Sequence, residues 1–221
     1  EGTALKQTFG RFDMNTLFPT YIKQTDNGSY FKINGIETEF ELPVLGTHNI
    51  LNALAAMLVA HYFGISYDKM KAGLATLKVT NMRMELIEGI HGEKVINDAY
   101  NASPTSMNAA IELVTSLSGY KRKILVLGDM LELGPEEESF HLAVGKEIDY
   151  SKIDYVFTYG KLGEFIAKGA QEVFPEDRVF SFLDKNKLLE ELKKYTNRDT
   201  LILVKGSRGM KLEEIVHGLQ N

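Results

Sequence analysis

Two short stretches of this sequence gather side chains that could do chemistry. Residues 205–209 read Lys-Gly-Ser-Arg-Gly, so two cations, a hydroxyl and two glycines fall within five residues, which suits a cradle for a carboxylate or a phosphate. Asp98 directly follows the predicted apolar strand Lys94–Asn97, and its carboxylate could accept hydrogen bonds from vicinal hydroxyls such as those of a ribose. Plain surface turns are the alternative for both, because aspartate and glycine favour turns in any case.

Two polar pairs are further candidates. Asn49 and Asn52 lie three residues apart at the start of an expected helix, so their amides share one face and could read the edge of a base. Capping support by Asn49 and a polar spot at Asn52 are the alternatives. Asp129 and Glu132 could resemble a metal pair, but neither a nearby histidine nor a third carboxylate completes it, so we predict acidic loop residues and no metal site.

Several familiar sites are excluded by what the sequence lacks. With no cysteine, the chain can form no disulfide, thiolate zinc site or cysteine nucleophile, which suits a reducing cytoplasm. The five histidines are dispersed without ligand spacing. Neither a G-x-x-x-x-G-K-[ST] phosphate-binding loop nor a G-x-G-x-x-G dinucleotide motif occurs.

Charge and hydropathy narrow the class of partner. A net charge of -5 and a pI of about 5.6 argue against nucleic acid, whose binding needs a basic face. The longest apolar run, residues 53–65, is interrupted and too short to cross a bilayer. We therefore expect small-molecule substrates and no membrane span.

The first third of the chain predicts a small sheet and two helices. Residues 20–43 alternate polar and apolar residues, which is typical of a three-stranded antiparallel meander. Apolar residues then recur at helical spacing from residue 50, with Thr47 as the expected cap and Gly64 as the expected end. A second short helix is predicted over residues 67–76, capped by Ser66.

The remainder alternates apolar runs with amphipathic segments, which indicates a mostly parallel sheet with crossover helices. The predicted strands are Lys94–Asn97, Lys123–Leu127, Tyr155–Thr158, Val179–Phe182 and Leu201–Val204. The predicted helices are Pro104–Leu117, Glu136–Ile148, Leu162–Val173, Lys185–Tyr195 and Met210–Leu219. The best boundary lies at residues 77–82, and all of the net negative charge follows it. We therefore predict domains at 1–79 and 80–221, the second being α/β and Rossmann-like.

Ligands of open parallel sheets bind beyond the carboxyl ends of the strands, where loops and helix amino termini converge. Four of the five predicted strands end in a polar loop. These loops hold Asp98 and Asn101, then Asp129, and finally Lys205, Ser207 and Arg208. The residues alone therefore predict a small-molecule-binding α/β protein.

Several stretches resemble the Mur ligase family. Residues 46–56 (GTHNILNALAA) are similar to the family's helix near the adenine of ATP, and residues 98–104 (DAYNASP) to a loop whose aspartate holds the ribose. Residues 128–134 (GDMLELG) with His141, and residues 205–208, are similar to the branch that uses D-alanyl-D-alanine. Arg83 matches an arginine that approaches the ATP phosphates.

This resemblance implies a role for each candidate. Nucleotide contacts fall to Asn49, Asn52, Asp98 and Asn101, and Arg83 serves both as a nucleotide contact and as the catalytic cation. Substrate contacts fall to Asp129, Lys205, Ser207 and Arg208. The fold implied is a Rossmann-like carboxyl-terminal domain preceded by a partial central ATP-binding domain, namely the antiparallel meander plus two helices.

The implied activity is an ATP- and Mg²⁺-dependent amide ligase. It would phosphorylate the terminal carboxylate of a UDP-N-acetylmuramoyl tripeptide and join it to D-alanyl-D-alanine, in peptidoglycan precursor synthesis and hence cell-wall formation, cell shape and division. The family's phosphate-binding loop, most magnesium ligands and modified lysine would lie upstream, so we expect this chain alone to be an inactive fragment. A non-catalytic nucleotide-binding or interaction module stays open as the alternative.

Overall fold

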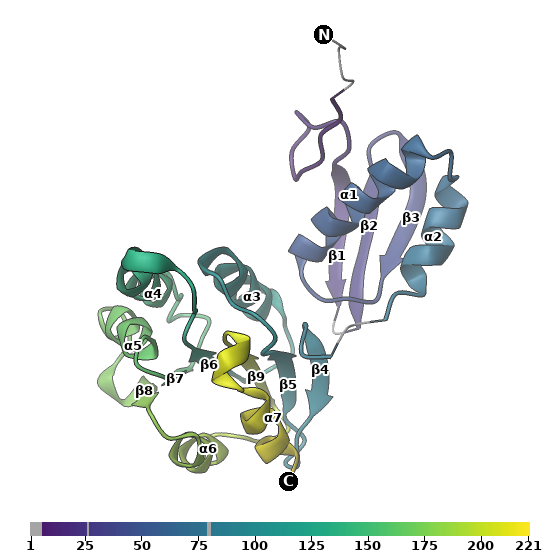
Figure 1. Ribbon diagram of the computed structural model, residues 1–221. Coiled ribbons are helices and arrows are strands. Elements are labelled where there is room, and N and C mark those ends of the chain that lie inside the picture. The colour runs from purple at the N-terminus through teal and green to yellow at the C-terminus, as the bar shows by residue number, and fades with distance from the viewer. Residues whose placement is uncertain (1–5, 26, 79–80) are drawn as a thin grey trace. The chain divides into compact units, whose positions relative to one another are not determined.

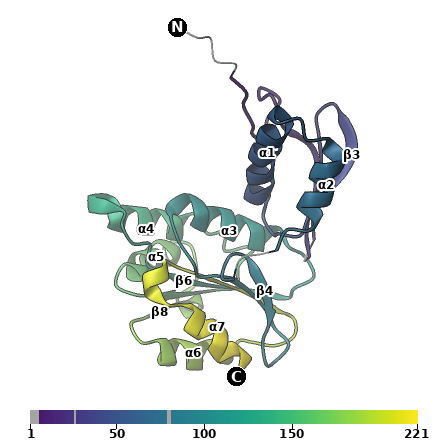
Figure 2. The same cartoon turned by 45° about the vertical axis from the view of Figure 1, so that its right-hand side comes forward.

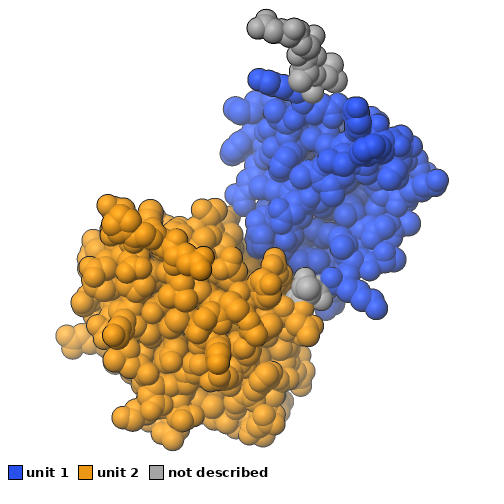
Figure 3. Space-filling view, viewed as in Figure 1, with its two compact units in different colours: residues 1–79 blue, residues 80–221 orange. Residues whose placement is uncertain are grey.

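The computed structural model describes residues 6–25, 27–78 and 81–221. The chain divides into two compact units, residues 1–79 and residues 80–221 (Figure 3). The step from Val79 to Thr80, where the sequence places the domain boundary, lies outside the described residues. Each unit is therefore described by itself.

The first unit is a three-stranded antiparallel sheet with two helices. Strands β1 (Pro19–Thr25), β2 (Gly28–Ile33) and β3 (Ile36–Leu42) pair in chain order. Helices α1 (Thr47–Tyr62) and α2 (Tyr67–Ala75) lie against one face of this sheet (Figure 1). Both helices bury apolar side chains against β2 and β3 in a single cluster. The predicted meander and both predicted helices are confirmed.

The start of α1 differs from the expectation. Gly46, and not Thr47, is the residue before the first helical turn, and its φ of 96° is a value that glycine adopts without strain. The Thr47 hydroxyl instead accepts a hydrogen bond from the Gln24 side chain at 3.4 Å. A glycine at the cap position has no side chain that could indicate the start of a helix in the sequence. The cap was therefore predicted at the neighbouring Thr47, whose hydroxyl is a common capping group.

The second unit is built on a six-stranded sheet with the order β4-β5-β9-β6-β7-β8. Five strands are parallel, as predicted: β5 (Lys94–Asp98), β6 (Arg122–Gly128), β7 (Tyr155–Tyr159), β8 (Val179–Phe182) and β9 (Thr200–Lys205). The sixth strand, β4 (Glu85–Glu88), was not predicted; it pairs antiparallel with β5 at the edge. This strand has only four residues, and two of them are glutamates, so it carries little apolar signal.

Helices cover both faces of this sheet (Figures 1 and 2). On one face lie the helices that follow β5, β6 and β7, namely α3 (Pro104–Ser116), α4 (Glu137–Lys146) and α5 (Gly163–Gln171). On the other face lie α6 (Lys185–Lys193) and α7 (Glu213–Gln220). The chain moves steadily from β5 toward β8 and then returns through α6 to β9 in the centre. Because such crossovers are right-handed, reversing the direction places α6 on the opposite face.

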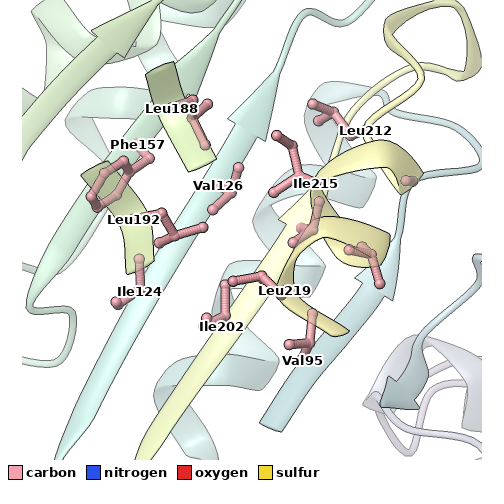
Figure 4. Close-up of a cluster of buried hydrophobic side chains, with 13 residues drawn as sticks. Val95, Ile124, Val126, Phe157, Leu188, Leu192, Ile202, Leu212, Ile215 and Leu219 are labelled. Carbon is pink, nitrogen blue, oxygen red and sulfur yellow. The ribbon is translucent and has the colours of Figure 1, made fainter. Parts of the chain in front are cut away.

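One core of the second unit lies between the central strands and helices α6 and α7 (Figure 4). Alternate strand residues such as Val126 and Ile202 point to this face and meet Leu192, Ile215 and Leu219 from the helices. Full burial on both faces explains why the strands read as continuous apolar runs in the sequence. No helix formed by the described residues combines the length and the apolar character that a bilayer span requires.

Candidate functional site

The polar loops of the second unit meet because β9 lies between β5 and β6. Asp98 and Lys205 are register partners at the ends of β5 and β9. Glycine makes the neighbouring approach possible, since a Cβ atom added to Gly206 would lie 3.2 Å from the Gly128 Cα atom at the end of β6. The strand order thus brings three of the predicted loops, those after β5, β6 and β9, to one edge of the sheet.

Asp98 and Lys205 form a buried ion pair at this edge. The Lys205 Nζ atom contacts Asp98 Oδ2 and also donates to the Asn101 carbonyl oxygen at 3.0 Å. Only 3% of the Lys205 side chain and 11% of the Asp98 side chain is exposed. Lys205 was predicted beside a substrate or solvated, and the partners found here are instead Asp98 and Asn101. The lysine therefore holds the aspartate and the start of its loop together, while the Asn101 side chain faces solvent.

Arg83 is presented by a strained turn next to this pair. The residues on either side of it, Met82 and Met84, have φ values of 61° and 51°, a region that costs a non-glycine residue about 1–2 kcal/mol. The loop after β5 holds both residues: Tyr100 N donates to Met82 O at 3.1 Å, and Met84 N donates to Asp98 Oδ1 at 3.2 Å. The Arg83 guanidinium carbon lies 4.3 Å from the centre of the Tyr100 ring.

The loop after β6 is fixed by two side chains. His141, which is fully buried in α4, accepts a hydrogen bond from Met130 N through Nε2 at 2.8 Å, and its Nδ1 lies 2.6 Å from Glu137 O. These partners require the tautomer with the proton on Nδ1. Ser207 Oγ accepts from Leu131 N at 2.9 Å, which joins this loop to the loop after β9. His141 is therefore structural, and Ser207 has a structural contact as well.

Asp129 is buried at the base of the same loop. Its Oδ1 atom accepts a hydrogen bond from Gly163 N at the start of α5, at 2.7 Å. Burial raises the pKa of this carboxyl above its ordinary value of 3.8, although the backbone donors of Gly163 and Leu162 act in the opposite direction. A Cβ atom on Gly160, whose φ is 106°, would collide with this carboxylate at 2.2 Å. Asp129 is thus a packed anchor between two loops, which the sequence did not reveal.

Arg208 is an exposed cation at this edge. Its Nη1 atom donates to Glu213 Oε1 at 2.7 Å and also lies 3.1 Å from the Met82 sulfur. Both of these contacts are made by Nη1, and among the described residues no hydrogen-bond partner is found for Nε or Nη2. The side chain is 54% exposed. A guanidinium held at one corner can still grip a carboxylate with its remaining donors.

Asn49 and Asn52 belong to the first unit. The Asn49 side chain donates to Leu45 O at 2.8 Å, as expected of a residue that supports the start of a helix, and Asn52 donates to Asn49 Oδ1 at 3.2 Å. The two amides therefore touch on one face of α1, and Asn52 is exposed. Their predicted role in reading a base stays a prediction.

Among the described residues, no group of three or more His, Asp or Glu side chains could hold a metal ion. The pair considered in the sequence is divided, because Asp129 is buried and Glu132 is exposed with a φ of 65°.

Comparison with known sequences places this edge within a characterised domain. A family model described as "Mur ligase, glutamate ligase domain" matches residues 82–208. The chain is 53% identical over 213 residues to the UDP-N-acetylmuramoyl-tripeptide--D-alanyl-D-alanine ligase of Bacillus subtilis, a match that covers 96% of this chain and 47% of that protein. The chain thus spans about half the length of this relative.

Comparison of structures gives the same grouping. The chain resembles the MurF crystal structure from Acinetobacter baumannii with a TM-score of 0.84 and 26% identity, over 97% of this chain and 46% of that one. It also resembles the MurF ligase of Thermotoga maritima in complex with ADP, with a TM-score of 0.79 and 22% identity, over 96% and 47% of the two chains. At that lower identity the likeness concerns the fold alone.

Proposed function

The chain belongs to the Mur ligase family, and we propose that a full-length protein carrying it joins D-alanyl-D-alanine to a UDP-N-acetylmuramoyl tripeptide, using ATP. The identity to the Bacillus subtilis ligase of that name supports this branch. In this proposal residues 1–79 are part of the central ATP-binding domain, and residues 80–221 are the carboxyl-terminal ligase domain. The observation that carries it is the meeting of Asp98, Arg83 and Arg208 at one sheet edge, inside the matched region.

Asp98 is assigned to the ribose of ATP. The buried Lys205 ammonium neutralises the charge of Asp98. Met84 N donates to Oδ1 and Lys205 Nζ to Oδ2, so each carboxylate oxygen keeps a second lone pair for a hydroxyl donor. We assign Asn101 to the same nucleotide because it lies in the loop that Lys205 fixes. Asn49 and Asn52 are assigned to the adenine, through the exposed amide of Asn52. Lys205 then acts on the nucleotide through Asp98, and not by direct contact with the dipeptide.

The chemistry proceeds in two transfers. A carboxylate oxygen of the tripeptide attacks the γ-phosphorus of ATP, the bond to the β-γ bridging oxygen breaks, and an acyl phosphate and ADP form. The dipeptide amine then attacks the acyl carbon, phosphate leaves, and the nitrogen loses a proton as the amide forms. Arg83 is assigned to the transferring phosphoryl group, where a fixed positive charge lowers the barrier.

The dipeptide carboxylate is assigned to Arg208. Its exposed guanidinium offers donors in a fixed fork, which matches the two oxygens of a carboxylate. Ser207 and Asp129 support this contact indirectly: Ser207 joins the loop after β6 to the loop that carries Arg208, and Asp129 anchors the loop after β6 to the start of α5. Most of the magnesium ligands are assigned to parts of the full-length protein outside this chain. We place the reaction in the cytoplasm, where ATP is available and a cysteine-free chain needs no oxidising environment.

The test is release of ADP by the full-length protein in the presence of different acceptors. We expect ADP to appear at the full rate only when the UDP-muramoyl tripeptide and D-alanyl-D-alanine are both present. D-alanine or L-alanyl-L-alanine at the same concentration should not replace the dipeptide. If a single amino acid supports the full rate, the branch is wrong. If nothing stimulates ADP release, the chain is the non-catalytic module that its α/β fold also permits.

A further inference from the structure

The direction of the Arg83 side chain depends on Tyr100, a residue to which the proposed reaction assigns no role. Arg83 is exposed, and an exposed arginine has many rotamers of similar energy. In this structure its guanidinium lies over one ring, that of Tyr100, at 4.3 Å from the ring centre. A cation over the face of a tyrosine is attracted by the negative face of the ring. The ring therefore selects one direction for a side chain that would otherwise be free to move.

The backbone of Arg83 is fixed by the same short loop. The Met82 carbonyl oxygen accepts a hydrogen bond from Tyr100 N, and Met84 N donates one to the Asp98 carboxylate. Both methionines are held with positive φ, a conformation that persists only where the surroundings impose it. The stretch from Asp98 to Tyr100 thus fixes the residue before Arg83, the residue after it and the guanidinium of Arg83 itself.

We propose that Tyr100 is a positioning residue that holds the Arg83 guanidinium in the direction needed at the transferring phosphoryl group. This inference rests on the proposed function, in which Arg83 serves the phosphoryl group and Asp98 the ribose. Since Asp98 and Tyr100 belong to one loop, the loop that holds the nucleotide also directs the cation that acts on it. Tyr100 touches neither reactant in this role.

The kinetic experiment uses the full-length protein, four single variants and one double variant. Tyr100→Leu removes the ring and should lower kcat about two- to fivefold, as expected for a cation over an exposed ring, with little change in the KM for ATP. Tyr100→Phe keeps the ring face and should restore most of kcat. Tyr150→Leu removes a tyrosine of comparable exposure elsewhere in the second unit and should change nothing. Arg83→Ala should lower kcat, and adding Tyr100→Leu to it should cause no further loss.

A spectroscopic experiment on the 221-residue chain tests the contact itself. In the wild-type chain the Tyr100 ring current should shift the proton resonances next to the Arg83 guanidinium upfield. The shift should be kept in Tyr100→Phe and lost in Tyr100→Leu. Each variant should first show unchanged resonances in β6 and β7, so that misfolding is detected separately.

The outcomes separate the inference from the function beneath it. If Arg83→Ala leaves kcat unchanged, Arg83 does not serve the phosphoryl group and that part of the proposed function is wrong, whereas the resonance shift still decides whether Tyr100 holds the guanidinium. The inference is overturned if Tyr100→Leu costs as much without Arg83 as with it, or if phenylalanine fails to restore kcat. A rise in the KM for ATP with constant kcat overturns it too, because Tyr100 would then contact the nucleotide.

Discussion

The buried pair between Lys205 and Asp98 makes a quantitative prediction about stability. Replacing Lys205 by Met keeps the length of the side chain but leaves Asp98 charged in a site where 11% of its side chain is exposed. Removing one partner of a buried ion pair costs about 3–5 kcal/mol. In a domain about as large as the second unit, each kcal/mol of lost stability lowers the unfolding midpoint by about 2–4 °C. The midpoint of the second unit should therefore fall by about 10 °C.

Thermal and urea unfolding of the 221-residue chain, followed by circular dichroism, measure this change. Lys94→Met is the matched control, because Lys94 also pairs with a carboxylate on a neighbouring strand, Glu88, but 37% of the Lys94 side chain is exposed. The unfolding midpoint of this variant should stay close to that of the wild type. The double variant Lys205→Met with Asp98→Asn removes both charges and should be more stable than Lys205→Met alone. The reasoning fails if Lys205→Met behaves like the control, or if the two single losses simply add in the double variant.

Three further predictions concern the site. In the full-length protein, Asp98→Asn should raise the KM for ATP about ten- to a hundredfold, since a charged hydrogen bond to a hydroxyl contributes about 1.5–3 kcal/mol; an unchanged KM would remove Asp98 from the ribose. Arg208→Lys keeps the charge without the fork, so the KM for D-alanyl-D-alanine should rise while that for ATP barely moves, and the reverse pattern would assign Arg208 to the nucleotide. Burial raises the pKa of Asp129, so the folded state holds this proton more tightly than the unfolded state, and its contribution to stability falls as pH rises from 3.8 through the raised pKa. Asp129→Asn should lack this decline, whereas parallel melting curves against pH for the two proteins would show that Asp129 is not the cause.

Local patterns in the sequence were sufficient for most of the fold. The apolar runs that became β5, β6 and β9 are buried on both faces, and their composition alone marks them as inner strands of the sheet. The predicted start of a helix at Pro104 is confirmed, since α3 begins with a capping box at Ser103 and a proline in the first turn. The edge strand β4 escaped because its residues are half polar.

The roles within the site could not be predicted in the same way, because they depend on which loops become neighbours. Lys205 reads in sequence as an exposed cation beside two glycines, and only the insertion of β9 next to β5 gives it Asp98 as a partner. Ser207 likewise reaches the loop after β6 from a segment that lies 76 residues further along the chain. The contact of Arg83 with Tyr100 requires the backbone strain at the neighbouring methionines, for which the sequence contains no glycine as a signal.

The central claim is that the full-length protein activates the tripeptide carboxylate as an acyl phosphate and passes it to D-alanyl-D-alanine. The most direct measurement uses a UDP-muramoyl tripeptide whose terminal carboxylate carries ¹⁸O, with mass spectrometry of both products. We expect a UDP-muramoyl pentapeptide together with inorganic phosphate that contains one labelled oxygen for each amide bond formed. A pentapeptide accompanied by unlabelled phosphate, or labelled phosphate without a pentapeptide, would contradict this account.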